Sequence, residues 1–496
     1  MTEITTFPLL SLLIFSPLAG AALIWFFDKP ETIRLIALLT STTSLIISLL
    51  ILINFDNTNS GFQFIEKISW IPTLNINYLI GIDGISILFL PLTCLLFAGV
   101  IIGSWTSISS LPRLYYSLLL FLLSAIIGIF SALDTMLFFL FWEMTLIPLY
   151  FLISLWGVGP NRRYAAVKYT LFMLTSGVAL LFAFVILAFA HANGDVPAQL
   201  SFNYLQLLST AIPVDTQTTI FFLLLIGFGA KAALFPFHTW LPTVAMEGPA
   251  SIAAIMTGLK LGLYGFIRFI VPLTPQASQD FHWLLAGLGV IGILYGAIVA
   301  MNQSNLRRML AYSSISHAGL VLLGIAAFNI QGIQGAVYQL LNFTIIAGGI
   351  YILSGFLHHR TGSTDTISLG GAATTMPLLA SFFFLFGLAS MGIPGTNGFI
   401  AEHLILISAL QSHTGAGLAA LAGMILSASY FLVIYKRAFL GPCINPVVTS
   451  AIDLRPRELA ITLLLAGLIL FTGLYPGGIL EITKAASETW LLRLKG

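Results

Sequence analysis

Charge is scarce in this sequence: 8% of its 496 residues are charged, whereas 58% are hydrophobic. A typical soluble domain carries roughly 25% charged residues, so the composition excludes a soluble globular protein and indicates a polytopic membrane protein. Lysine and arginine form no basic tract, and the net charge is only +2. The composition therefore argues against a nucleic-acid partner and predicts the lipid bilayer as the surroundings of the chain.

Cysteine is also rare. The two cysteines, Cys94 and Cys443, lie far apart without C-x-x-C spacing, so we predict neither a disulfide framework nor an iron–sulfur site. Residues 287–292 match the dinucleotide pattern G-x-G-x-x-G, but they lie in an apolar run, where small residues favour close helix packing. The sequence contains no metal-ligand cluster, nucleophile elbow or phosphate loop. We therefore expect no catalytic residue, no metal and no cofactor in this chain, and any cofactor domain must belong to another chain.

Long apolar runs dominate what is present. Because about 20 apolar residues cross a bilayer, the runs predict an all-α polytopic membrane protein with about fourteen transmembrane helices. The expected ranges are 7–27, 35–53, 85–103, 114–130, 135–156, 165–190, 220–241, 249–271, 283–301, 309–328, 333–357, 376–410, 418–435 and 459–474. The connections 54–78 and 191–219 are too short for a separate soluble core.

The distribution of lysine and arginine predicts the orientation, because positive charge concentrates in cytoplasmic loops. With the N-terminus outside, the cytoplasmic side holds Lys29, Arg34, Arg113, Arg162, Arg163, Lys168, Arg307, Arg308, Arg360, Lys436, Arg437, Arg455 and Arg457. The opposite side holds only Lys67, Arg268, Lys484, Arg493 and Lys495. We therefore predict an integral membrane protein with both termini on the lumenal or periplasmic side.

Two of the predicted helices are interrupted by proline and glycine. The run 376–410 contains Gly-Ile-Pro-Gly-Thr-Asn-Gly at 392–398, and the run from residue 220 contains Pro236 and Pro242. Such breaks are tolerated at membrane depth only where the freed backbone is buried in protein or lines a wet cavity. In both runs a Phe-Gly pair precedes the proline by the same spacing, Gly229 to Pro236 and Gly387 to Pro394.

Matching interrupted helices indicate inverted repeats with a transport site between them. We therefore predict inverted five-helix repeats with discontinuous helices 7 and 12. The expected division is N-terminal helices 1–3 at residues 1–113, a first repeat of helices 4–8 at 114–271, and a second repeat of helices 9–13 at 282–438. Helix 14 and a tail follow at 459–496.

Four charged residues lie inside these apolar runs: Glu143, Lys231, Lys260 and Glu402. A charge at the bilayer centre costs roughly 2.5–3.5 kcal/mol, so such residues usually mark an ion or proton route. A buried lysine whose carboxylate partner approaches or withdraws is a switchable proton carrier, with Glu143 the partner for Lys231 and Lys260 the next relay point. The alternatives are a static ion pair between Glu143 and Lys231, snorkelling of Lys260, and capping of free backbone amides by Glu402.

Two histidines are further candidates for the pathway. His317 follows a serine-rich stretch inside its helix, and histidine titrates near neutral pH. His238 follows the break in helix 7, where it could bridge freed carbonyls or carry protons. A purely structural imidazole remains the alternative for His317, and His358 and His359 at a helix end are expected to be solvated surface.

Several motifs together resemble the antiporter-like membrane subunits of respiratory complex I and of the type-1 NAD(P)H dehydrogenase complexes, from about Asp134 to Pro476. They are Phe-Trp-Glu-Met-Thr-Leu-Ile-Pro at 141–148, Lys231 with Pro-Phe-His-Thr-Trp-Leu-Pro at 236–242, Lys260, the stretch 313–319, and Ile-Pro-Gly at 393–395 leading to Glu402. The resemblance implies subunit 4, the M or D type. It also implies one proton channel in which Glu143 and Lys231 are coupled, Lys260 is central, His317 lies on the connecting axis and Glu402 lies toward the exit.

The resemblance further implies a non-redox, proton-translocating subunit of an NAD(P)H- or ferredoxin-quinone oxidoreductase, with plastoquinone as one possible quinone. The expected partners are other membrane-arm subunits, including neighbouring antiporter-like subunits. The expected location is a cyanobacterial thylakoid or a bacterial inner membrane. A divergent cyanobacterial copy would serve CO2 uptake and would have a carbonic-anhydrase-like partner.

Two rival functions stay open. A cation/proton antiporter subunit of the Mrp type resembles this chain around Glu143 and Lys231, but such subunits typically carry lysine in the twelfth helix, where this chain has Glu402. An inert scaffold whose charges only hold helices in register is the second. The chain also departs from the family pattern: Thr243-Val244-Ala245 replaces Asp-Ala-His after Pro242, and Phe343 stands where a histidine is usual.

Overall fold

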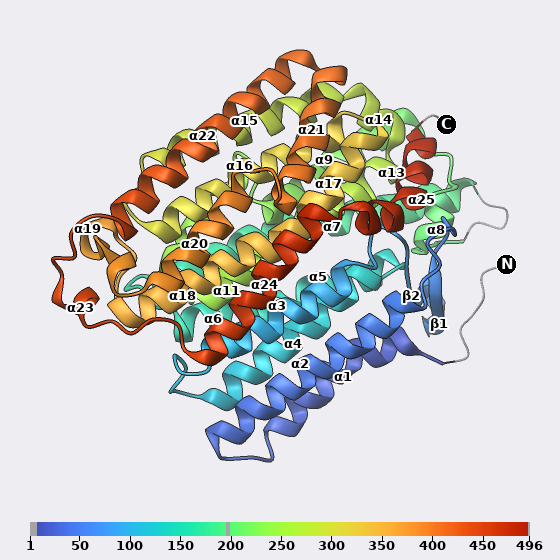
Figure 1. Ribbon diagram of the computed structural model, residues 1–496. Coiled ribbons are helices and arrows are strands. Elements are labelled where there is room, and N and C mark those ends of the chain that lie inside the picture. Colours follow the sequence, from blue (N-terminus) through green and yellow to red (C-terminus); the bar gives the residue numbers. More distant parts are fainter. Residues whose placement is uncertain (1–6, 195–198, 495–496) are drawn as a thin grey trace.

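A computed structural model describes residues 7–194 and 199–494, and its helices run side by side along one axis (Figure 1). Eleven helices of the described part are long and apolar enough to cross a membrane, and a bent pair at residues 366–390 would add a twelfth. Two shorter apolar helices, Leu9–Ile24 and Phe89–Ser104, occupy predicted ranges as well. The prediction of a polytopic helical membrane protein is therefore confirmed. Helix occurs in all fourteen predicted ranges, and the number of membrane-spanning helices remains a prediction.

The N-terminal part contains the helices α1 (Leu9–Ile24), α2 (Pro30–Ile53), α3 (Phe89–Ser104) and α4 (Pro112–Ser131). Between α2 and α3, where we expected only a polar connection, an antiparallel hairpin forms from β1 (Gln63–Ile71) and β2 (Ile76–Ile82). The hairpin supports α1 directly, because the Glu66 carboxylate accepts hydrogen bonds from the backbone N–H groups of Leu10 at 2.8 Å and Ser11 at 3.2 Å. These amides are the free donors at the start of a helix, where negative charge is stabilising.

Helix α4 occupies the place of the first helix in the predicted first repeat, residues 114–271, and the other elements of that repeat follow. They are α5 (Thr135–Met144), α6 (Leu146–Trp156), α7 (Arg162–Gly194), α8 (Tyr204–Leu207), α9 (Val214–Ala232), the 3-10 turn η2 (Phe237–Thr239), α10 (Trp240–Glu247), α11 (Ala250–Gly258), α12 (Leu261–Gly265), the π-helical η3 (Phe266–Ile270) and α13 (Val271–Leu273). Helices α5 and α6 together fill the predicted range of helix 5, α9 and α10 fill helix 7, and α11 to α13 fill helix 8.

The second half of the chain continues the bundle. It contains α14 (Pro275–Asp280), α15 (His282–Met301), α16 (Leu306–Ala326), α17 (Ile330–Asn342), the π-helical η4 (Phe343–Ala347), α18 (Gly348–Thr361), α19 (Thr366–Leu369), η5 (Ala372–Thr374), α20 (Pro377–Ser390), α21 (Asn397–Ser412), α22 (Thr414–Phe439), α23 (Pro446–Thr449), α24 (Pro456–Leu474) and α25 (Gly477–Leu494). The predicted tail is therefore largely the helix α25.

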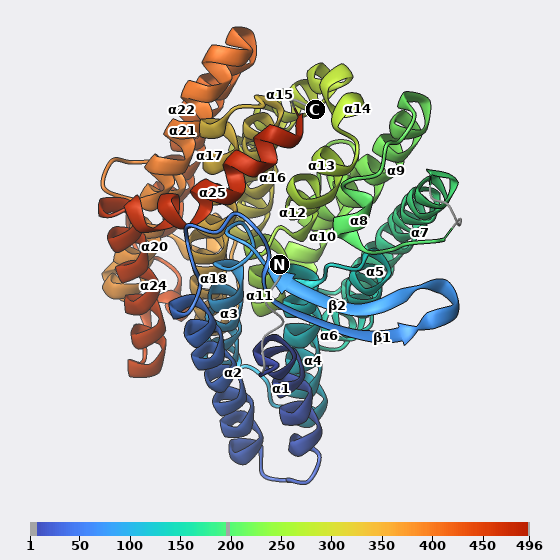
Figure 2. The same ribbon diagram turned by 90° about the vertical axis from the view of Figure 1, so that its right-hand side faces the viewer.

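The two ends of the bundle differ. One end, here called the hairpin face, carries β1, β2, α8, α14 and α25, and α25 lies across it (Figure 2). The opposite end, here called the basic face, carries α19, α23 and most of the loops rich in arginine and lysine (Figure 1). Residues 1–6 and 495–496, which include the predicted termini and Lys495, lie outside the described residues.

Helices 7 and 12 are broken where proline and glycine predicted it. Helix α9 ends before Ala233, which has φ +57°, and α20 and α21 are separated by a loop in which Gly392 has φ +66° and Gly395 φ +91°. A third break was not expected: Lys260 has φ +36° and separates α11 from α12. This break is stabilised by a neighbouring helix, because the Thr344 hydroxyl donates a hydrogen bond to the freed Gly258 carbonyl at 3.0 Å.

The two halves share a local pattern that supports inverted repeats. Asp134 caps α5 and forms a bridge with Asn203, and Asn305 caps α16 and forms a bridge with Asp365. Each bridge is formed by the same pattern of two backbone hydrogen bonds. In the first bridge Thr135 N donates to Phe202 O at 2.8 Å and Tyr204 N donates to Leu133 O at 2.8 Å. In the second bridge Leu306 N donates to Thr364 O at 3.0 Å and Thr366 N donates to Ser304 O at 2.9 Å. The first bridge lies at the hairpin face and the second at the basic face. The exact boundaries of the repeats remain a prediction.

Candidate proton pathway

Lys231 lies at the end of α9, beside the break in helix 7. Its ammonium donates a hydrogen bond to the Thr145 hydroxyl at 2.8 Å and a longer one to the Trp142 carbonyl at 3.4 Å. It also lies 3.9 Å from the centre of the Trp142 ring, a favourable position for a cation over an aromatic face. The junction between α5 and α6 therefore binds this lysine without a carboxylate.

Glu143 lies on the same segment but points elsewhere. No contact within 4.0 Å joins its carboxylate to the Lys231 ammonium. Instead one carboxylate oxygen packs against Gly177 of α7, where a side chain larger than hydrogen would collide with it. The close ion pair that we kept as an alternative is therefore not formed between these two half-buried side chains in this structure.

Lys231 and Lys260 line the same cavity, which has a volume of about 30 Å³ and also contacts Thr145, Tyr169 and Trp240. This volume is enough for a water molecule, since a buried site needs roughly 10–15 Å³ to hold one. Lys260 is only 2% exposed, and its ammonium forms no hydrogen bond or ion pair with the described residues. A water in this cavity would connect the two lysines.

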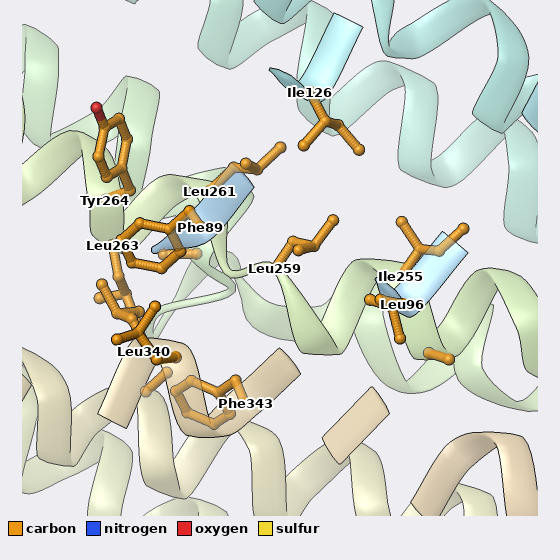
Figure 3. Close-up of a cluster of buried hydrophobic side chains, with 14 of the residues drawn as sticks. Phe89, Leu96, Ile126, Ile255, Leu259, Leu261, Leu263, Tyr264, Leu340 and Phe343 are labelled. Carbon is orange, nitrogen blue, oxygen red and sulfur yellow. The ribbon is translucent and has the colours of Figure 1, made fainter. Parts of the chain in front are cut away.

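Phe343 lies on the other side of Lys260. The Lys260 ammonium is 5.5 Å from the centre of this ring, and the ring meets His317 edge to face at 6.4 Å between centres. Figure 3 shows Phe343 among apolar side chains from α3, α4, α11 and α12, including Leu259 and Leu261 on either side of Lys260. An aromatic hydrocarbon thus separates the central lysine from the histidine.

His317 and Glu402 lie together beyond Phe343. The imidazole Nδ1 is 3.4 Å from a carboxylate oxygen of Glu402, and Nε2 is 3.3 Å from the Ser390 hydroxyl. His317 faces a cavity of about 30 Å³ that is also lined by Ser313 and Asn342, and with Glu402 it faces a second cavity of about 10 Å³. No backbone amide of the described residues bonds to Glu402, so the alternative that it caps free amides is not what the structure contains.

His238 lies apart from these groups, on the side of the helix 7 break that leads to the basic face. Its Nε2 is 3.1 Å from the Tyr295 hydroxyl, and its Nδ1 is buried without a partner. Nearby, the Lys168 ammonium donates to the Thr239 carbonyl at 2.8 Å and to the Thr243 hydroxyl at 3.2 Å. Lys168 was expected at a helix end, and nothing in the sequence pairs it with Thr243.

A second buried charge pair was not expected at all. The Arg268 guanidinium makes a bidentate pair with the Asp83 carboxylate at 2.6 Å and 2.7 Å. Burial by itself would raise the pKa of Asp83, but the charge and hydrogen bonds of Arg268 outweigh it and hold that pKa below its usual value. Arg268, which we placed with the charges of the outer side, is thus a buried link between the loop after β2 and helix 8.

Broken helices and buried charges inside a helical bundle are typical of ion-translocating membrane proteins of the antiporter-like class. The particular family follows from residues 132–427, which match the family model described as "NADH:quinone oxidoreductase/Mrp antiporter, TM". The chain belongs to this family, and within it to the antiporter-like subunit 4 group of complex I.

Its relatives support this placement. The chain is 36% identical to NADH-quinone oxidoreductase subunit M of Rickettsia conorii over 98% of this chain and 99% of the relative. It is 38% identical to NAD(P)H-quinone oxidoreductase chain 4 1 of Synechococcus elongatus over 85% of this chain and 79% of the relative.

Solved structures share the fold. A chain of respiratory complex I from Thermus thermophilus with bound NADH has a TM-score of 0.89 and 26% identity, covering 98% of this chain and 100% of that one. A chain of the Mrp complex from Dietzia has a TM-score of 0.85 and 21% identity, covering 98% and 99%. The second likeness concerns the fold alone.

Proposed function

We propose that this chain forms one proton channel of a quinone oxidoreductase complex and carries no redox chemistry itself. Protons are exchanged between Lys231 and Lys260 through a water in their shared cavity and then pass to His317 and Glu402. The cavity between the two lysines is the observation that carries this proposal, because it joins two otherwise separate buried charges with a site for water. Redox chemistry in other subunits changes the distance between Glu143 and Lys231, and with it the proton occupancy of Lys231.

The route to the two surfaces follows from the broken helices. His238 and Lys168 lie toward the basic face, which the positive-inside rule makes cytoplasmic, and they would lead protons to Lys231. Glu402 lies on α21, which runs to the hairpin face and would release protons there. Both termini then lie on the lumenal or periplasmic side.

The surrounding complex follows from the relatives' names. Other membrane-arm subunits, among them antiporter-like neighbours, are the expected partners, and the electron donor, the quinone and every cofactor belong to other chains. Because the relatives include a bacterial subunit M and a cyanobacterial chain 4, both a bacterial inner membrane and a thylakoid membrane fit, and so does a complex that drives CO2 uptake with a carbonic-anhydrase-like partner. Mass spectrometry of the copurifying chains would distinguish these, and small Mrp subunits in the preparation would favour the antiporter alternative.

The experiment replaces Lys231 with alanine in the complete complex reconstituted into vesicles. We expect K231A to assemble and reduce quinone while its proton-to-electron ratio falls, because the first relay is gone. K29A, a change of an exposed lysine in a loop, is the matched control and keeps the wild-type ratio. A wild-type ratio in correctly assembled K231A would refute the proposed channel.

A further inference from the structure

A large cavity near the basic face plays no part in the proposed channel. It has a volume of about 320 Å³ and lies between α3, α11, α18, α24 and the start of α16. This size falls within the range of small-molecule sites, about 300–1,000 Å³. Its polar lining includes Ser104, Ser251, Arg307, His358, His359 and Glu458. His359 is exposed, as we expected, whereas His358 is partly buried at this cavity.

Arg307 is the unusual member of this lining. It is only 1% exposed, and of its nitrogens one donates to the Gly248 carbonyl at 2.5 Å, whereas Nε is buried with no acceptor. No carboxylate of the described residues lies within 4.0 Å of its guanidinium. A buried charge without a partner is strongly destabilising, so this arginine needs an anion or water that the chain itself does not supply.

The one carboxylate in the cavity does not serve Arg307. Glu458 is bonded by the Arg360 guanidinium and by the backbone N–H of Arg455 at 3.0 Å. The other deeply buried arginine, Arg268, has its own carboxylate in Asp83. Of these two buried guanidinium groups, therefore, only Arg307 faces an open cavity with no carboxylate of the described residues within 4.0 Å.

We propose that this cavity binds a phosphate-bearing anion through Arg307. Guanidinium groups match phosphate oxygens in geometry and form strong, charge-assisted hydrogen bonds with them. His358 lines the same space, whereas the hydroxyls of Ser104 and Ser251 already bond to the Ile101 carbonyl at 3.2 Å and the Tyr115 hydroxyl at 2.8 Å. Basic pockets between transmembrane helices at the cytoplasmic side bind the head groups of anionic lipids.

The cavity also has apolar lining residues, which include Val100, Ile352 and Phe356. Such walls suit the first carbons of an acyl chain, so the head group of an anionic phospholipid is the source that the lining favours over free phosphate. The bound anion would join helices of the N-terminal part, of both predicted repeats and of the C-terminal part at one point. This site does not depend on the proton pathway.

The test compares R307Q with R308Q in the assembled complex, because Arg308 is adjacent, equally charged and exposed. Photoactivatable phosphatidylglycerol and phosphatidylcholine are added in vesicles, and the crosslinked peptides of this chain are identified by mass spectrometry. We expect phosphatidylglycerol to label residues 100–108 or 352–359 in the wild type and in R308Q, and labelling to fall about tenfold in R307Q, as for loss of one charge-assisted pair. R307K, which keeps the charge without the planar fork, should give intermediate labelling.

A second experiment distinguishes a lipid head group from free phosphate as the bound anion. If millimolar inorganic phosphate abolishes the phosphatidylglycerol labelling, or if radiolabelled phosphate itself binds the wild type and R308Q but not R307Q, the site exists and its occupant is free phosphate. Equal labelling of R307Q and R308Q would overturn the proposal. Should R307Q fail to assemble, equal labelling of the wild type by the anionic and the zwitterionic probe would overturn it as well.

Discussion

In the proposed channel, single residues decide whether protons can pass between the buried ionisable side chains. Lys260 shares a cavity large enough for a water molecule with Lys231, and its ammonium lies 5.5 Å from the centre of the Phe343 ring. His317 and Glu402 form their own group beyond that ring. Ionisable groups therefore lie near both sides of Phe343, and the ring itself offers no group that can bind a proton.

Replacing Phe343 with histidine should supply such a group. An imidazole can accept and donate protons between Lys260 and His317, whereas a hydrocarbon ring cannot. We expect the passive proton permeability of vesicles containing the idle F343H complex to rise by about an order of magnitude, equivalent to a barrier lower by 1.4 kcal/mol. F343L keeps an apolar side chain and is the control. A permeability of F343H equal to that of F343L would show that the ring is no barrier.

Gly177 offers a test of Glu143 that leaves both ionisable residues in place. A methyl group at this glycine would occupy the position of one Glu143 carboxylate oxygen, so G177A must displace the carboxylate. We expect the proton-to-electron ratio of reconstituted G177A to fall, as we also expect for E143Q, with an overpacking cost of about 1–3 kcal/mol in stability.

Gly415 provides the matched control, since it lies in the helix α22 and nothing would contact a methyl group there. G415A should pump like the wild type. If G177A pumps normally in an assembled complex, the observed position of the Glu143 carboxylate has no role in the channel.

Among the elements, the breaks in helices 7 and 12 were predictable and the break in helix 8 was not. Proline and glycine predict the breaks in helices 7 and 12, because these residues change the backbone locally. Gly258 and Gly262 flank Lys260, but no proline interrupts this stretch. The left-handed backbone of Lys260 is accompanied by a hydrogen bond from Thr344, far along the chain, to the Gly258 carbonyl. The β-hairpin was missed for a similar reason: strand pairing between residues 63 and 82 is a non-local contact that short polar connections do not reveal.

The loop between α20 and α21 makes an element-scale prediction. Gly395 has φ +91° and nothing near its missing side chain, so G395A is opposed only by backbone strain. For a residue with a side chain such strain costs roughly 1–2 kcal/mol. We expect the thermal unfolding midpoint of the G395A complex to fall measurably below that of G415A, which has ordinary helical geometry. Equal midpoints would mean that the break in helix 12 tolerates a residue other than glycine.

At the scale of the whole molecule, the sequence identifies a membrane bundle with buried charges but not which charges meet. The motifs predict that Glu143 is the partner of Lys231. In the structure the Glu143 carboxylate packs against Gly177 instead, and the close pair is formed by His317 and Glu402. The link between Asp83 and Arg268 joins a loop after the hairpin to helix 8, and Trp490 of α25 bonds to the neighbouring Ile267 carbonyl at 2.8 Å. These long-range contacts hold the hairpin face together, and no local pattern in the sequence encodes them.

The Asp83–Arg268 pair should give the assembled fold an acid limit. Because the folded state lowers the pKa of the Asp83 carboxyl, the pair stabilises the protein at every pH above the unfolded value of about 3.9, and this contribution is lost as the pH falls through the lowered pKa. D83N leaves the guanidinium buried without a countercharge, which costs about 3–5 kcal/mol. We expect thermal unfolding of the wild-type complex to show a stability loss at acid pH that D83N lacks, with D83N less stable throughout the neutral range.

The exposed carboxylate of Asp56 provides the control, and D56N should keep the wild-type profile, because a surface group contributes little. Parallel acid profiles for the wild type and D83N would show that the hairpin face does not depend on this pair.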